Sequence, residues 1–233
     1  MGTQPGTDSS SPRRVADLIG PLNDVEERYA EALYLAGDPA LLEGTIRVSV
    51  VGSRKASESG VKRAARLVKS LVHADVVVVS GLAIGIDTAA HRHAIEFGGR
   101  TIAVLGTPLD RPYPPQNAAL FAEIVRDHLA VSQFGPGQPV QRGNFPRRNR
   151  TMALLSHATV ILEAGESSGS LSQGWEAIRL GRPLLVSRAL ADDPALKWPR
   201  AMLDHGALVL ETEADLLDVL PERGYANRGG PPF

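Results

Sequence analysis

The chain contains no cysteine among its 233 residues. This absence excludes disulfide bridges, thiolate metal sites and a cysteine nucleophile. Aromatic residues make up only 5% of the chain, so any platform on which nucleobases stack must be small. The formal net charge is −1, so the chain as a whole lacks the excess of lysine and arginine that is typical of proteins that neutralise phosphates. No run approaches the ~18 apolar residues that a membrane span needs, and we expect no membrane partner.

The length and the remaining composition are those of an ordinary globular protein. Hydrophobic residues account for 43% and charged residues for 22% of the chain, which suits one α/β domain with a single core. Residues 1–12 are rich in glycine, serine, threonine and proline and have no apolar stretch. This pattern predicts a disordered leader, because a signal peptide would need an apolar segment. A cytoplasmic location is therefore expected.

Short apolar runs alternate with segments of helical periodicity over most of the chain. Strands are predicted at 46–51, 76–79, 101–105, 129–132, 159–162, 183–186 and 207–210. Helices are predicted at 60–72, 87–97, 169–180, 201–205 and 212–220, with further ones through Phe121 and after Phe145-Pro146. Regular β–α alternation with apolar strands predicts an α/β fold with a doubly wound, mostly parallel sheet and helices on both faces.

Three glycine-bearing loops each follow a predicted strand and precede a predicted helix. They span residues 51–54, 80–87 and 163–170. In an open parallel sheet such loops meet at the carboxyl edge, where glycine lets a ligand approach the backbone and helix N-termini offer N–H groups. A single loop of this kind could simply end a strand, but three together predict a phosphate-binding site.

Arginine residues accompany these loops. Arg54 directly follows the first glycine turn and can fork onto a phosphate; an ordinary surface salt bridge is the alternative. The run 145–150 adds Phe145, Arg147, Arg148, Asn149 and Arg150, in a stretch that contains no carboxylate. At helical spacing Arg147 and Arg150 share one face and Arg148 points elsewhere. We therefore expect one or two of these arginines to contact a ligand, while Asn149 could instead bond a neighbouring loop.

The motifs at residues 32–42, 51–54, 80–91 and 145–150 resemble the DNA-processing protein A (DprA/Smf) family. The order of the blocks agrees as well, including 101–106, Tyr113-Pro114 with Asn117, and 168–171. The resemblance covers roughly residues 30–220. It implies a Rossmann-like domain that binds single-stranded DNA without cutting it, hands the DNA to the recombinase RecA and commonly forms a homodimer.

The resemblance also implies a division of the chain and a set of contact residues. Residues 13–45 would be an N-terminal helical prelude and connection, 46–220 the Rossmann-like core, and 221–233 a tail without the winged-helix module that many relatives append. No cofactor, metal or catalytic residue is expected. The predicted DNA- or phosphate-binding residues are Gly52, Ser53, Arg54, Ser80, Gly81, Gly85, Phe145, Arg147, Arg148, Asn149, Arg150, Ser168, Gly169 and Ser170.

Other functions stay open because the loops depart from the family pattern at Pro108, Gln133, Gln173-Gly174 and Ser187-Arg188. A nucleotide-binding sensor is one alternative, and a phosphoribohydrolase of the same superfamily is another. Gln173 stands where such hydrolases carry their catalytic glutamate, and an amide cannot act as an acid. Glu163 or Glu166 could substitute. A non-enzyme is nevertheless favoured.

Two further pairs of residues have more than one interpretation. Asp87 and His91 would share a helix face, but Asp87 is better explained as a cap of backbone N–H groups and His91 as a packed side chain. Tyr113 and Phe134 fall in loops near strand ends. Each could stack on a base or cover the core.

Overall fold

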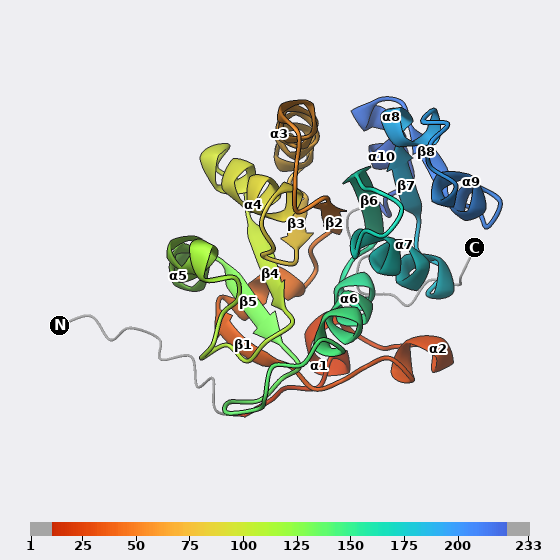
Figure 1. The fold of residues 1–233 in the computed structure, drawn as a ribbon. Helices are drawn as coiled ribbons and strands as arrows, with labels where there is room; N and C mark the ends of the chain where they lie inside the picture. Colours follow the sequence, from red (N-terminus) through yellow and green to blue (C-terminus); the bar gives the residue numbers. More distant parts are fainter. Residues whose placement is uncertain (1–10, 223–233) are drawn as a thin grey trace.

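The computed structural model describes residues 11–222 and contains one eight-stranded sheet in the order β1-β5-β4-β3-β2-β6-β7-β8 (Figure 1). Strand β1 pairs antiparallel with β5, and every other neighbouring pair is parallel. The strands are β1 (Tyr34–Gly37), β2 (Arg47–Gly52), β3 (Val77–Ser80), β4 (Thr101–Leu105), β5 (Leu129–Ser132), β6 (Ala158–Glu163), β7 (Leu184–Ser187) and β8 (Leu208–Leu210). The predicted α/β fold with a doubly wound, mostly parallel sheet is confirmed.

Helices cover both faces of the sheet, as predicted (Figure 1). One face carries α3 (Glu58–His73), α4 (Ile86–Glu96), α5 (Ala118–Asp127) and α10 (Glu213–Asp218), and the other carries α6 (Asn144–Leu155), α7 (Ser170–Arg179) and α9 (Trp198–Leu203). Alternate strand residues point to opposite faces. Val77 and Val79 accordingly pack with the α6 side and Val78 with the α3 side. The short helix α8 (Arg188–Ala191) had not been predicted.

The N-terminal segment completes one edge of the sheet. It contains α1 (Ala16–Ile19), α2 (Asp24–Glu27), strand β1 and the 3₁₀ helix η1 (Pro39–Leu42). Leu33 and Leu42 are fully buried in the same core cluster as α6. The expected helical prelude is therefore partly wrong in its secondary structure, because its last part is a strand that pairs with β5. The leader and tail predicted at the two ends lie almost entirely outside the described residues.

The direction of chain winding reverses between β2 and β6. The chain runs from β2 through β3 and β4 to β5 on one side, and from β6 through β7 to β8 on the other. The three glycine loops follow β3, β2 and β6, which are neighbours in the sheet, so they meet at its carboxyl edge as predicted. Within residues 11–222, no helix has the length and apolar character required to cross a membrane.

Candidate nucleic-acid interface

An open pocket lies at the carboxyl edge of the sheet. Its volume is about 350 Å³, and a smaller recess of about 90 Å³ shares three of its lining residues. The elements around them are the turn after β2, the loops after β3 and β4, and the loop that leads from β5 into α6. The larger pocket is lined by Arg54, Tyr113, Val140, Gln141, Arg142 and Phe145. The recess reaches Gly81, Ala83, Ile84, Gly106 and Arg148.

Two aromatic side chains form part of the pocket wall. The rings of Tyr113 and Phe145 meet edge to face, with 6.1 Å between their centroids. Tyr113 is 52% exposed. Phe145 packs against Gly106, where an added Cβ would lie 2.7 Å from the phenyl Cδ1. This close packing fixes the ring of Phe145 in the pocket wall.

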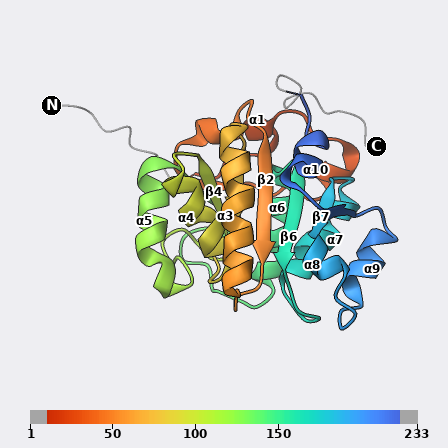
Figure 2. The ribbon, with the colours of Figure 1, turned by 90° about the horizontal axis from the view of Figure 1, so that it is seen from above.

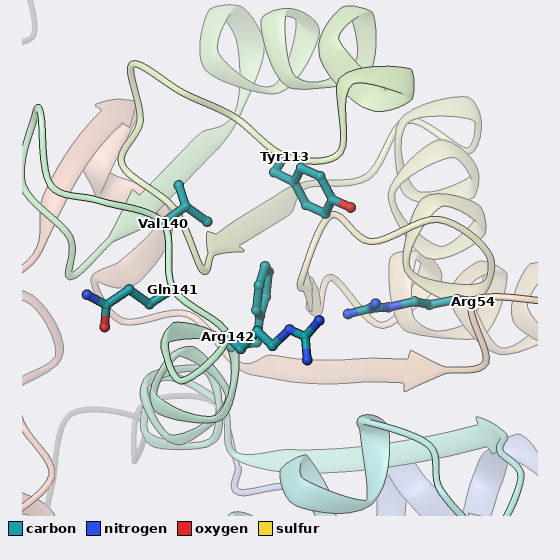
Figure 3. Close-up of a pocket in the computed structure, with 6 residues that line it drawn as sticks. Arg54, Tyr113, Val140, Gln141 and Arg142 are labelled. Carbon is teal, nitrogen blue, oxygen red and sulfur yellow. The ribbon is translucent and has the colours of Figure 1, made fainter.

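Two guanidinium groups approach the pocket from opposite sides. Arg54 extends from the turn after β2 and Arg142 from the loop before α6, and their charged ends point toward one another (Figure 3). The Cζ atom of Arg54 lies 5.9 Å from the ring centroid of Phe145. Neither arginine forms an ion pair with any residue in the described part of the chain. Both positive charges are therefore available to an anionic ligand.

The loop between β3 and α4 is shaped by its backbone and by Asp87. Gly85 has a φ of +88° and lies against the backbone of Ser53 and Arg54, which leaves no room for a side chain. The buried carboxylate of Asp87 accepts hydrogen bonds from the N–H groups of Gly81 (3.1 Å) and Ala83 (3.3 Å). Burial raises the pKa of Asp87, and the nearby charge of Arg148 opposes that rise. The prediction that Asp87 caps the N–H groups of its own helix is wrong, because its carboxylate bonds the preceding loop and α4 has no side-chain cap.

Arg148 is a structural bridge beneath the pocket. Its Nη1 donates to the carbonyl oxygens of Gly81 (2.5 Å) and Val104 (2.7 Å), and its Nε donates to the side-chain oxygen of Asn149 (3.0 Å). Burial lowers the pKa of Arg148. These bonds tie α6 to the ends of β3 and β4, and the same guanidinium borders the recess.

Arg147 and Arg150 point away from the pocket, on one shared face of α6 as predicted. Arg147 pairs with Glu31 at 2.6 Å and lies over the ring of Phe134. Arg150 lies 4.7 Å from the ring centroid of Tyr29 and 3.6 Å from the carboxylate of Glu176. Both arginines therefore hold the N-terminal segment against the core. The expectation that they contact a ligand is not tested by these contacts, and the engagement of both side chains within the chain argues against it.

The third glycine loop does not line the pocket. Asn149 donates from Nδ2 to the carbonyl of Gly169 at 3.2 Å. This contact is the bond to a neighbouring loop that the sequence allowed as the alternative to ligand binding by Asn149. The hydroxyl groups of Ser168 and Ser170 bond each other at 2.7 Å. Ligand contacts by this loop remain untested.

Several predicted contact residues support the loops of the site. Ser80 is fully buried and donates to the carbonyl of Val50 at 2.7 Å, so its hydroxyl holds β3 to β2. An added Cβ at Gly52 would lie 2.7 Å from Ile86 Cγ1. The carbonyl of Ser53 accepts the Ile86 N–H at 3.1 Å. These three residues fix the turn that presents Arg54.

The residues considered for acid–base chemistry are engaged elsewhere. Glu163 accepts hydrogen bonds from the N–H (2.9 Å) and the hydroxyl (2.5 Å) of Ser57, and it lies 3.4 Å from Arg63. Glu166 accepts the N–H of Lys197. Gln173 is fully buried on α7. None of these three side chains lines the pocket.

His91 and Phe134 belong to the interior. His91 shares a hydrogen bond of 2.7 Å between Nδ1 and the hydroxyl of Thr101, and burial lowers its pKa to about 3. Phe134 is 2% exposed, so it covers the core beneath Arg147. Of the two loop aromatics, only Tyr113 reaches the pocket.

Sequence reasoning left Arg142, Val140 and Gln141 out of the predicted contact set. They lie in a loop rich in glycine and proline, whose path depends on the packing of α6 and is not encoded by periodicity. The available signal was the position of Arg142 in the carboxylate-free stretch that continues to Arg150.

The family model and the curated relatives that match this chain all belong to one group of DNA-processing proteins. The model of the family "DNA recombination-mediator protein A" matches residues 12–221. DNA processing protein DprA of Streptococcus pneumoniae is 39% identical over 171 residues, which are 73% of this chain and 60% of that protein. DprA of Bacillus subtilis is 31% identical over 191 residues, 82% of this chain and 64% of that protein. The chain thus spans less than two thirds of these curated relatives.

Solved structures show the same similarity. The S. pneumoniae DprA structure has a TM-score of 0.76 at 35% identity. The matched region is 85% of this chain and 72% of the S. pneumoniae chain. A structure of DprA from Helicobacter pylori, described for the single-stranded DNA binding mode of that protein, has a TM-score of 0.73 at 25% identity. The matched region is 89% of this chain and 92% of the H. pylori chain. A molybdenum cofactor binding protein of Rippkaea orientalis, 18% identical with a TM-score of 0.55, shares the fold alone. The family match, the identities and the common fold agree that this chain belongs to the DNA recombination-mediator protein A family, which includes the DNA processing proteins DprA and Smf.

Proposed function

We propose that this chain binds single-stranded DNA in the pocket at the carboxyl edge of the sheet. The observation that carries the proposal is the pair of unpaired guanidinium groups, Arg54 and Arg142, on either side of an aromatic wall. Single-stranded DNA is bound by cationic grooves that follow its backbone and by aromatic rings on which its bases stack. Phosphates would lie between the two arginines and a base against Phe145.

Family membership supports the wider role. The H. pylori relative is a protein with a single-stranded DNA binding mode, and this chain shares its fold and most of its length. We infer that the bound strand is handed to the recombinase RecA and that the protein acts as a homodimer. Both inferences rest on the family resemblance.

A binding role without catalysis agrees with the chemistry of the pocket. Its lining contains arginine, aromatic, amide and aliphatic side chains and no carboxylate. Glu163 and Glu166 bond other parts of the chain. Hydrolysis of an N-glycosidic bond needs a positioned acid or base within reach of the scissile bond, which these residues do not supply.

The test is fluorescence anisotropy with labelled oligo-dT, competed by thymidine monophosphate. We expect saturable binding that the mononucleotide displaces poorly. The binding constant should fall steeply with salt, at a log–log slope of about −0.7 for each contacted phosphate. Binding that is insensitive to salt, or that occurs with the mononucleotide and not with the oligonucleotide, would favour the nucleotide sensor and contradict the proposal.

The remaining parts of the proposal have separate tests. Incubation with nucleoside monophosphates should release no free base. If base were released, and Glu163→Gln or Glu166→Gln abolished the release, the phosphoribohydrolase would replace the binding protein. Sedimentation with and without purified RecA tests both assemblies: we expect a dimer alone and a heavier species with RecA, and a monomer that leaves RecA unchanged would contradict both inferences.

A further inference from the structure

We propose that the exposed basic face of α3 carries the DNA strand onward from the pocket, across the outer surface of the protein. This inference rests on the proposed function, because it concerns the path of the strand once the pocket is filled. The partner is the sugar–phosphate backbone of single-stranded nucleic acid, held by charge without regard to sequence.

Four basic residues lie along one side of α3. They are Lys62, Arg66, Lys69 and His73, at intervals of four, three and four residues, and all four are exposed. Residues three and four apart lie on the same helix face. The opposite face is apolar and buried, with Ala64, Leu67, Val68 and Leu71 in the core. The helix therefore presents a stripe of basic side chains to solvent.

The charges of this stripe are mostly unneutralised. Lys62 and Lys69 form no ion pair with any residue between 11 and 222. Arg66 lies 3.9 Å from Glu213, and the side chains are 67% and 39% exposed. A pair so long and exposed contributes little energy and yields readily to a phosphate. Although the net charge of the chain is −1, positive charge is concentrated here.

The stripe begins close to the pocket. Helix α3 begins at Glu58, four residues after Arg54, and Lys55 lies between them. Figure 2 shows α3 extending from the carboxyl end of β2 along the outer face of the sheet. Glu58 is the acidic residue of this helix, and it stands four residues before Lys62 on the same face. It lies where the strand would pass from the pocket onto the helix.

The dimensions of α3 give the length of DNA that it can hold. Its basic residues run from Lys62 to His73 and span about 17 Å at about 1.5 Å per residue. A stacked strand advances about 3.4 Å per nucleotide, so the stripe matches roughly five nucleotides beyond the pocket. Short oligonucleotides should thus use the pocket alone, and longer ones should gain affinity and salt dependence from α3.

The experiment compares oligo-dT of about four and about twelve nucleotides by anisotropy over a range of salt concentrations. The test variant is Lys62→Gln/Lys69→Gln, since glutamine keeps helix propensity and removes the charge. The matched control is Arg28→Gln/Arg200→Gln, which makes the same change in net charge at the C-cap of α2 and on α9, two elements away from α3 (Figure 1).

For the longer oligonucleotide, the test variant should reduce the magnitude of the log–log salt slope by about 1.4, the loss of two phosphate contacts. Its affinity for the shorter one should be unchanged, and the control should match the wild type with both. Glu58→Gln should strengthen binding of the longer oligonucleotide only. The proposal is overturned if the test variant and the control behave alike, or if both lengths lose affinity equally. Arg54→Ala should weaken both lengths; if it weakens neither, the pocket itself is not the binding site.

Discussion

The guanidinium group of Arg148 fills the space that a side chain at Gly81 would need: a Cβ added at Gly81 would lie 2.6 Å from Cζ of Arg148. The guanidinium donates to the carbonyl of the same glycine at 2.5 Å and to that of Val104 at 2.7 Å. The loop after β3 therefore requires glycine at this position because a buried arginine from α6 lies against its backbone, whatever ligand the pocket holds.

We predict that Gly81→Ala lowers the free energy of unfolding by about 2 kcal/mol or more, because it displaces a buried charge from its hydrogen bonds. Gly165→Ala is the control, since a Cβ there would meet nothing within 4 Å. Urea denaturation measures both. In an Arg148→Met background the cost of Gly81→Ala should be much smaller, as a double-mutant cycle would show. Equal costs in the two backgrounds would mean that the two residues are not coupled.

Phe145 is expected to contribute to DNA affinity through stacking. Phe145→Leu should weaken oligo-dT binding by about 1–3 kcal/mol and leave the salt slope unchanged, because stacking involves no phosphate. Phe121→Leu, on α5, serves as the control for a general loss of aromatic packing. Anisotropy at several salt concentrations separates the two contributions. A changed slope with unchanged affinity at low salt would show that Phe145 acts on the cations and does not stack.

His91 should make stability depend on pH. Its pKa is lowered to about 3 by burial, while the unfolded chain takes up the proton near pH ~6.5. The unfolded state therefore binds more protons between these values, and the free energy of unfolding falls as the pH falls, by up to about 1.4 kcal/mol per unit. The raised pKa of Asp87 acts in the opposite sense, between the ordinary value of its carboxyl and the higher value in the folded chain, and this range overlaps that of His91.

The measurement for His91 is urea denaturation at about pH 7 and about pH 5, above the range where most carboxylates titrate. His91→Asn removes the titrating group and keeps a side chain able to bond Thr101. The wild type should lose more stability between the two pH values than this variant. Identical losses would show that His91 does not titrate with unfolding.

The sequence predicted most of the fold, because the strands are short apolar runs separated by amphipathic helices. All predicted strands agree with the structure to within one residue at each end. Strand β1 was missed because Tyr34–Gly37 has little alternation of its own and is defined by its antiparallel pairing with β5. Pairing with a distant strand leaves no local periodic signal.

The candidate site was predicted in part. The glycine loops and Arg54 were placed at the correct edge by strand–loop–helix order alone. The separation of Arg148 from Arg147 and Arg150 followed from helical spacing. The partners of Arg147 and Arg150 could not be predicted from helical spacing, because Glu31 and Tyr29 come from a distant segment of the chain. Arg142 was missed as a pocket residue for a similar reason: its loop is positioned by tertiary packing.

The central claim is tested most directly by oligo-dT anisotropy with Arg54→Ala and Arg147→Ala compared side by side. Each removes one exposed guanidinium, but Arg54 faces the pocket and Arg147 is paired with Glu31 on the other side of α6. Loss of a forked phosphate contact should make Arg54→Ala bind roughly ten- to a hundredfold more weakly. Arg147→Ala should bind as the wild type does. Equal losses, or a larger loss for Arg147→Ala with folding intact, would contradict the account.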